Sequence, residues 1–563
     1  MKKIQLSSLL TLKKRTKKIF LCCTSFSLLF ISACKKDQIE KLEDSSSTNQ
    51  VNSQIILGKR VDNPYSVENM KKAYQALSRN AKLENEDSPV RTTHLYVRFL
   101  PKDWAQYDTL IADTSLELYN IPLDYEIVSQ GSNYHDPSIS SDLPTWQYTT
   151  VPVDYKFNPQ IKYEVITEAY IPELDPQLNT RNTNQRNTFQ GKSFKDALLD
   201  QAFIITKNYD DTLKNYKGAK MSWTPSGTIK VYDSKLGDIP LEGVKIRVRR
   251  WIFVKVREAT TNANGYYQTE SFDRPVNYSL IWETNHFDVR TGTFGQAMFD
   301  GRKQSSPWNI TFSVDDANRF YCHVFRGAYR YHYKDIGGLK RPHFGFKLKY
   351  AAYDKASSEG DQGVNVGNWS YFALNPNIFI YRFGQYGQFD SDEIFSTTIH
   401  ETCHSTHASL MNASYVQYLQ VDETIAESWP VAVEWFITSM EYRERGISNY
   451  GKENYYNVTK RGYYASYPLH RGYQYWTKSI DPKYSSIFID LVDNFNQNNE
   501  TYQDSKGFNY LGIKDQVSGY TLSNIESVFL KYCYGISSLK EQCKKNKPSG
   551  ITDSQLDELL SNF

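Results

Sequence analysis

Alternating polar and apolar residues dominate the first half of the chain, whereas longer helical periods dominate the second half. Residues 65 to 79 place Met70, Tyr74 and Leu77 on one face at helical spacing, which predicts a short helix. Residues 93 to 173 contain β-rich runs broken by Pro, Gly and Asp, the pattern of a small strand-based unit. After about residue 307, amphipathic helical segments mix with aromatic strands, which predicts an α+β unit.

A second strand-rich region begins at Gly227, where polar and apolar residues alternate on both sides of an Asn264-Gly265 turn. The opening Gly-x-Ile, the step from Leu241 to Val244 and the segment from Thr261 to Tyr266 resemble the transthyretin-like, carboxypeptidase-regulatory-like β-sandwich of secreted bacterial proteins. The Lys and Arg residues of this region alternate with Ile and Val, as in a half-solvated strand pair. We therefore interpret these cations as a solvated face.

Length and charge narrow the class of protein. A chain of 563 residues is too long for one compact core and predicts a multidomain protein, at roughly 150 residues per domain. The 66 Lys and Arg residues nearly balance the 63 Asp and Glu residues, and the net charge of +3 is too small for a nucleic-acid footprint on so large a surface. We expect no nucleic-acid partner.

The N-terminus has the charged-then-apolar order of a secretory signal peptide. Its apolar run, from Ile19 to Ala33, is shorter than the about 20 residues needed to span a bilayer. The run ends in Ile31-Ser32-Ala33-Cys34, which resembles a bacterial lipobox; the alternative is an ordinary signal peptide with a chance cysteine. The resemblance implies that Cys34 is lipidated. It also implies that the protein is an outer-membrane lipoprotein like those of Bacteroidota, facing the periplasm or the cell surface.

One motif carries candidate chemistry: His400-Glu401-Thr402-Cys403-His404, a complete H-E-x-x-H. On a helix the two histidines lie one turn apart on the same face, so both imidazoles can bind one Zn²⁺ at about 2.0 Å. Glu401 then lies beside the open coordination position, where it can act as general base and later as general acid. Cys403 points away from the shared face and is interpreted as a small buried hydrophobe.

The third metal ligand must come from elsewhere. Metzincins require glycine at 407 and histidine at 410, but this chain has His407 and Leu410. The segment from Asp422 to Glu427 resembles the gluzincin arrangement of thermolysin-like peptidases and zinc aminopeptidases. That resemblance implies Glu423 as the third ligand and Glu427 as a second carboxylate that orients a zinc histidine. Two alternatives stay open, in which Glu427 is the ligand or neither carboxylate touches metal.

Other family features are less defined in this sequence. The Gly-x-Met-Glu-Asn signature of zinc aminopeptidases is absent, which favours an endopeptidase or an unrelated exopeptidase over that subfamily. The run from Pro376 to Arg382 is where gluzincins place the edge strand that pairs with substrate. Donors to the oxyanion are commonly Tyr or His in this clan, and the eligible residues are Tyr415, Tyr463, Tyr464 and His470. His407 is expected to be packed rather than a ligand, and Cys533 and Cys543 are a possible disulfide pair.

These patterns together predict a membrane-anchored, zinc-dependent metallopeptidase that hydrolyses peptide bonds in a peptide or protein substrate. The expected organisation is a signal peptide (1–33), a flexible tether (34–60), a β-rich N-terminal domain (61–220), a transthyretin-like β-sandwich (221–306) and an α+β zincin catalytic domain (307–563). One alternative is a surface lipoprotein that binds a glycan or host protein and keeps a structural or vestigial zinc site. Another is a zinc amidase that acts on peptidoglycan or glycoprotein.

Overall fold

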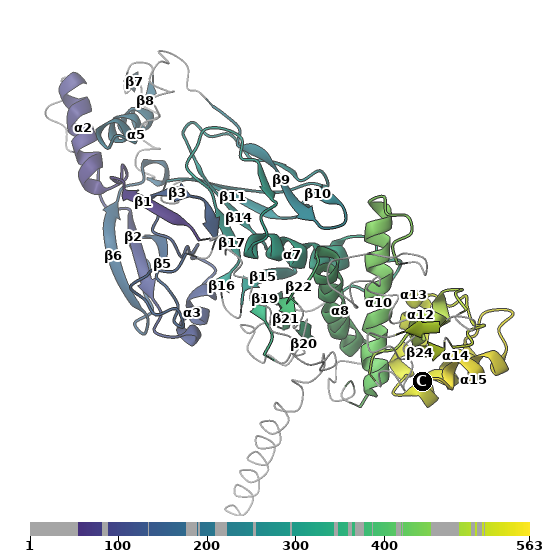
Figure 1. The fold of residues 1–563 in the computed structure, drawn as a ribbon. Coiled ribbons are helices and arrows are strands. Elements are labelled where there is room, and N and C mark those ends of the chain that lie inside the picture. The colour runs from purple at the N-terminus through teal and green to yellow at the C-terminus, as the bar shows by residue number, and fades with distance from the viewer. Residues whose placement is uncertain are drawn as a thin grey trace, which may run out of the picture.

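The protein has a mixed α and β fold built from several sheets and helices, consistent with a multidomain chain (Figure 1). The computed structural model describes residues 54–81, 88–132, 134–175, 188–189, 192–208, 222–251, 255–292, 295–342, 347–358, 363–365, 377–384, 387–411, 418, 420–451, 483–496, 501–503, 509–511 and 513–563. The expected signal peptide, including Cys34, lies outside these residues.

The N-terminal unit is built on a three-stranded antiparallel sheet in the order β5-β2-β6. Its central strand has a core on each face, because Tyr96 enters one hydrophobic cluster while Val97 and Phe99 enter another. The predicted helix at 65 to 79 is confirmed as α2, although α3 was not anticipated. The elements are β1 (Ile56–Arg60), α2 (Val67–Ala81), β2 (His94–Leu100), α3 (Trp104–Ile111), β3 (Tyr125–Ser129), β4 (Gly131–Ser132), β5 (Gln147–Pro152), β6 (Lys162–Ala169), η1 (Pro172–Leu174), β7 (Thr188–Phe189), β8 (Lys192–Ser193) and α5 (Phe194–Ile205).

Two sheets follow and share one hydrophobic cluster. One has the order β10-β9-β13, with β18 also paired to β9, and the other has the order β12-β11-β14-β17-β4. Strand β9 alternates buried and accessible side chains, as its sequence predicts, with Ile229 and Val231 in the core. The strands are β9 (Ser226–Asp233), β10 (Gly237–Pro240), β11 (Lys245–Arg250), β12 (Lys255–Thr260), β13 (Tyr266–Gln268), β14 (Asn277–Ile281), β17 (Met298–Asp300) and β18 (Ile310–Phe312).

A third sheet, with the order β16-β15-β19-β21-β20, supports the long helices. Strands β15, β19 and β21 run parallel, and α7 lies on the connection between β15 and β19 (Figure 1). Helices α8 and α10 follow, each packed against its neighbour. The elements are β15 (Phe287–Thr291), β16 (Gly295–Gln296), α7 (Ala317–Tyr333), β19 (Leu348–Ala356), β20 (Gly363–Asn365), β21 (Ile378–Gly384), β22 (Gly387–Gln388), α8 (Ser391–Leu410) and α10 (Glu423–Glu444).

Strand pairing crosses the domain boundary expected at residue 306. Strand β15 comes before this boundary but pairs with β19, whereas β18 comes after it and pairs with β9. Strand β4 of the N-terminal region also pairs with β17. These exchanges tie the successive units together, and local patterning does not reveal them because strand partners are set by non-local packing.

The C-terminal segment packs against α10 and completes the hydrophobic cluster that contains Trp429 and Phe488. Residues 522 to 532 form the short helix α13, continued by a π turn and a 3₁₀ turn. Cys533 and Cys543 are both free and buried, so the possible disulfide is not formed. The elements are α12 (Ile487–Val492), β23 (Thr501–Gln503), β24 (Asn509–Leu511), α13 (Leu522–Asn524), η3 (Ile525–Phe529), η4 (Leu530–Tyr532), α14 (Ile536–Lys545) and α15 (Asp553–Leu560).

A buried ionic network joins the β9–β10 hairpin to the long helices. Asp233, which is fully buried, accepts hydrogen bonds from Arg326 Nη1 at 2.8 Å and from the Tyr442 hydroxyl at 2.7 Å. Arg326 also pairs with Glu441 at 3.4 Å. Burial alone would raise the pKa of Asp233, but Arg326 holds it below its ordinary value. The hairpin is thereby fixed to α7 and α10.

Candidate metal centre

Helix α8 places both histidines of the H-E-x-x-H motif inside the protein. The helix begins after Asp390, whose backbone N–H donates to the Glu393 carboxylate at 2.6 Å, the reciprocal half of a capping box. It is buried along most of its length because α7, α10 and the sheet surround it. His400 and His404 are buried, and their ring centroids are 4.9 Å apart.

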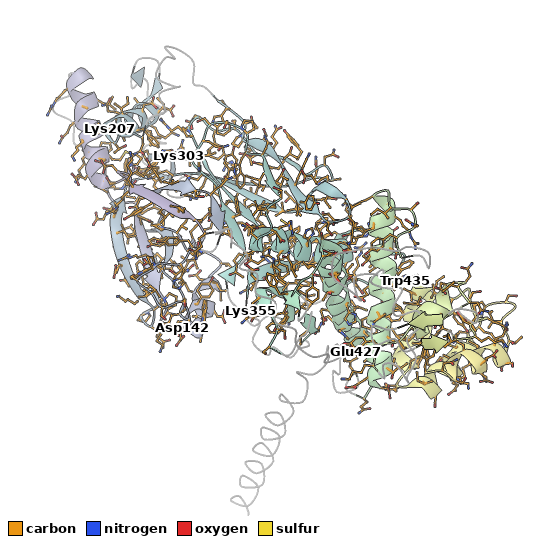
Figure 2. The ribbon with its side chains drawn as sticks, viewed as in Figure 1. Asp142, Lys207, Lys303, Lys355, Glu427 and Trp435 are labelled. Carbon is orange, nitrogen blue, oxygen red and sulfur yellow. The ribbon has the colours of Figure 1, made fainter. Side chains whose placement is uncertain are left out.

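The third member of the cluster is Glu427, which comes from α10. Its Oε2 lies 3.4 Å from His400 Nε2 and 3.4 Å from His404 Nε2. Figure 2 shows Glu427 on the half of α10 that lies alongside α8. Burial alone would raise the pKa of Glu427, but His404 and His400 lower it to about 2. The carboxylate is therefore ionised, as a metal ligand must be.

The structure does not bring Glu423 to the histidines, so the expectation for the third ligand is corrected. Glu423 is the first residue of α10; its side chain is 68% exposed and lies 3.4 Å from Lys483. The helix begins there because the side chain of Asp422 accepts a hydrogen bond from Thr424 N. The carboxylate that faces α8 is found one helical turn further on, at Glu427.

The donor set fits zinc. Two imidazole nitrogens and one carboxylate oxygen are zinc ligands, and ligand atoms at about 2.0 Å from a tetrahedral ion lie about 3.3 Å apart. The observed 3.4 Å separations match that edge length. In addition, His404 Nε2 is buried and has no hydrogen-bond partner among the described residues. A metal ion would satisfy this nitrogen.

The other ring nitrogen of each histidine faces an oxygen. His400 Nδ1 lies 3.6 Å from Glu434 Oε2, and His404 Nδ1 lies 2.9 Å from the Tyr418 hydroxyl. Such contacts fix the tautomer and orientation of a metal-binding histidine. From the sequence we expect Glu427 in this role, and neither Glu434 nor Tyr418 is predicted. Glu434 follows Glu427 by two helical turns and so was detectable, whereas nothing in the sequence marks Tyr418.

Glu401 lies beside the edge strand β20. Its side chain is almost fully buried, and Asn365 Nδ2 donates to its backbone carbonyl and to Ser405 Oγ. A Cβ atom at Gly363 would lie 2.7 Å from Glu401 Cγ and 2.7 Å from its Oε1. Strand β20 therefore approaches the Glu401 side chain so closely that any larger residue at position 363 would have to displace it.

The sheet edge nearest the motif is β20 rather than the strand expected from sequence. The described part of the run from Pro376 to Arg382 forms β21, which lies between β19 and β20. Among the described residues, β20 is the last strand on this side, and it pairs with β21 in an antiparallel register. The expectation that β21 is the edge strand is wrong, because β21 has a partner strand on each side. Strand β20 was missed because its three residues show no strand pattern in the sequence.

The remaining sequence candidates divide into two groups. Cys403 is buried in the core and burial raises its thiol pKa to about 12, which confirms a hydrophobic role. His407 packs against the rings of Tyr418 and Trp429, and burial followed by the influence of His404 lowers its pKa to about 3, so it is a packed neutral histidine. The four candidate oxyanion donors, Tyr415, Tyr463, Tyr464 and His470, lie outside the described residues.

Comparison with known proteins gives no relative: no family model, curated protein or solved structure matches this chain. Within the described residues, no helix combines the length and the apolar character needed to cross a membrane.

Proposed function

We propose that this protein is a zinc-dependent metallopeptidase, with His400, His404 and Glu427 as zinc ligands. One observation carries the proposal: the buried Nε2 atoms of two histidines on α8, the helix that also carries Glu401, each lie 3.4 Å from one buried carboxylate oxygen of Glu427 on α10. A purely structural zinc site uses four protein ligands and has no need of an adjacent base. Three ligands with a neighbouring glutamate are the composition of a catalytic zinc site.

The residues have separate roles in this proposal. Zinc would polarise the scissile carbonyl and lower the pKa of a bound water molecule to near 7. Glu401 accepts the proton of the attacking water and delivers it to the leaving amine. Glu434 and Tyr418 hold the two histidines in orientation from the far side of each ring.

An extended peptide is the substrate that suits the sheet edge. Strand β20 lies against the Glu401 side chain and ends the sheet among the described residues, and a peptide added along its outer side would form main-chain hydrogen bonds as an additional strand. Such pairing does not require a free chain terminus. We therefore propose an endopeptidase.

The proposal includes the domain types and the location expected from sequence. Lipidation at Cys34 would hold the protein on the bacterial outer membrane, on the periplasmic or the external face. The two sheets that lie between β9 and β18 and share one core support the proposal of a transthyretin-like sandwich. The unit that contains α8 and α10 would be the zincin-type catalytic domain.

The test compares the full-length chain with Glu401→Gln and with the control Glu541→Gln, an exposed glutamate paired with Lys545. Each protein is incubated with a mixed peptide and denatured-protein library, products are mapped by mass spectrometry, and bound zinc is measured. Wild type and control should give the same chelator-sensitive cleavages. Glu401→Gln should lose them while retaining one zinc, because the base and not a ligand has been changed.

Two outcomes would overturn this assignment. Cleavage by Glu401→Gln at the wild-type rate would remove Glu401 from the chemistry. Absence of cleavage by wild type with zinc bound would favour a binding protein, or an amide outside ordinary peptides.

A further inference from the structure

A second group of potential metal ligands lies apart from the histidine centre and consists of three aspartates. Asp490 is on α12, Asp493 is the C-cap of the same helix, and Asp515 lies in the segment before α13. Each offers one carboxylate oxygen, and these three oxygens lie within 4.8 Å of one another. Asp490 is fully buried, Asp515 is 3% exposed, and Asp493 is half-buried.

The Asp515 side chain has one oxygen without a hydrogen-bond partner among the described residues. Its Oδ1 accepts from Val517 N at 2.8 Å, whereas its Oδ2 is buried and unpartnered. The adjacent cation, Lys514, pairs with Glu558 at 2.9 Å instead. The backbone of Asp515 is fixed, since its N–H donates to Asn496 Oδ1 at 3.2 Å. A buried carboxylate oxygen in this situation needs a proton or a cation.

We propose that Asp490, Asp493 and Asp515 form a calcium-binding site, distinct from the histidine and glutamate centre on α8 and α10. The available donors are all carboxylate oxygens, which select hard cations over zinc. Calcium holds its oxygen ligands at about 2.3–2.6 Å in a flexible geometry, and oxygens on such a shell lie at separations up to about 5 Å. Magnesium demands a smaller, near-ideal octahedron and fits a half-buried site of this kind less well.

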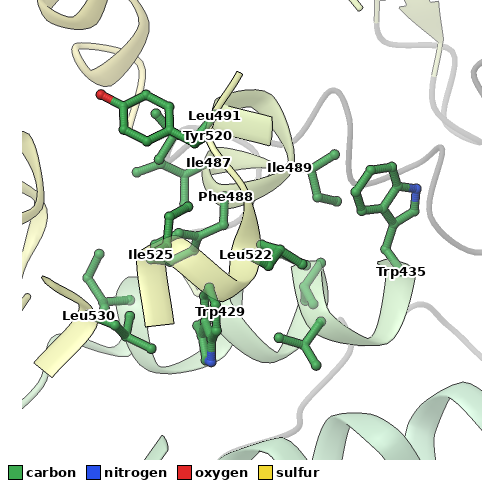
Figure 3. Close-up of a cluster of buried hydrophobic side chains, with 14 of the residues drawn as sticks. Trp429, Trp435, Ile487, Phe488, Ile489, Leu491, Tyr520, Leu522, Ile525 and Leu530 are labelled. Carbon is green, nitrogen blue, oxygen red and sulfur yellow. The ribbon is translucent and has the colours of Figure 1, made fainter. Parts of the chain in front are cut away.

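Calcium at this site would stabilise the packing of α12 against α10, the helix that carries Glu427. Helix α12 packs on α10 in one hydrophobic cluster, and Figure 3 shows Phe488 toward Trp429 and Ile489 beside Trp435. Just before α12, Ser485 N donates to Ser428 Oγ at 2.9 Å, and Ser428 follows Glu427 in the chain. The ion would connect α12 to the segment around Asp515 and so restrain the layer behind α10.

The test uses the full-length, zinc-loaded chain after removal of calcium on a chelating resin and restoration of zinc. Calcium binding is measured by calorimetry, and the midpoint of thermal unfolding is followed as calcium is added. The wild-type midpoint should rise with the logarithm of calcium concentration, because calcium binds only the folded state. Asp515→Asn should bind calcium at least about tenfold more weakly. Asp557→Asn, an exposed aspartate paired with Lys540, is the matched control and should behave as wild type.

Asp515→Asn should not lower the calcium-free unfolding midpoint, because the amide keeps the oxygen that accepts from Val517 N and has nearly the same size; this separates loss of the site from misfolding. Asp493→Asn, at the half-buried position, gives a second variant with the same expected loss of calcium affinity. Absence of calcium binding by wild type, unchanged affinity in both variants, or a larger response to magnesium would overturn the proposal. Zinc content and peptidase activity are separate readouts, because the proposed calcium site does not depend on the proposed function.

Discussion

The identity of the third zinc ligand gives the sharpest prediction, because two glutamates one helical turn apart have opposite environments. Glu427 is buried and lies 3.4 Å from both histidine Nε2 atoms, whereas Glu423 is 68% exposed and contacts Lys483. Glu427→Gln and Glu423→Gln make the same chemical change at the two sites. We expect only the first to weaken zinc binding.

The magnitude follows from the number of ligands. Four-ligand zinc sites bind with about 10–16 kcal/mol, so one ligand contributes about 2.5–4 kcal/mol, or about 10²–10³-fold in the dissociation constant. Glu423 takes part only in an exposed ion pair, worth at most about 1 kcal/mol. Its replacement should change zinc affinity by less than about fivefold.

The assay is competition for zinc against a chromogenic chelator at fixed pH, with the unfolding midpoint of each zinc-free variant as a folding control. A large loss of affinity in Glu423→Gln with wild-type affinity in Glu427→Gln would refute the assignment and restore the arrangement expected from sequence. Equal affinities in all three proteins would mean that zinc is not bound by α10.

Two further predictions concern positions around the site. Gly363→Ala should lower the rate of peptide cleavage by about 10²-fold with zinc retained, because the added methyl displaces Glu401. The control is Gly535→Ala, whose Cβ meets nothing closer than 3.8 Å and which should leave cleavage unchanged. A fully active Gly363→Ala would contradict the predicted contact. Asp233→Ala should lower the unfolding free energy by about 3–5 kcal/mol, because it leaves Arg326 buried without its main partner. Because the pKa of Asp233 is lowered in the folded protein, its contribution to the unfolding free energy is fully present above its unfolded-state pKa of about 4 and is lost as pH falls through the folded-state pKa. Calorimetry should therefore show the unfolding free energies of wild type and variant converging in acid.

The paired histidines could be predicted from sequence because their geometry is local. A spacing of four residues on a helix fixes which side chains share a face, and the burial of α8 agrees with its apolar surroundings. The third ligand depends on something less local, namely where α10 begins and how it rotates against α8. Glu423 and Glu427 are both acidic residues near a helix start, and only packing decides between them.

The strand pairing of the sheets was harder to predict from sequence than the helices. The alternation in β9 and β11 is plain, but the parallel pairing of β15 with β19 joins residues about 60 positions apart, across the expected domain boundary. The edge strand β20 has three residues and contains a glycine, so it carries no period to detect. Its importance comes from its close approach to the Glu401 side chain.

The distribution of buried contacts explains how the scaffold holds the candidate ligands at their spacing. Asp233 and Arg326 fix the C-terminal half of α10 through Glu441 and Tyr442, far along the helix from Glu427. Near Glu427, the contact of Ser428 with Ser485 and the packing of α12 restrain the N-terminal half. A helix held at both ends cannot rotate Glu427 away from α8 without breaking buried polar contacts, which cost about 1–3 kcal/mol each. The proposed zinc site is therefore preorganised by the scaffold, and variants that loosen either end should weaken zinc binding even though they touch no ligand.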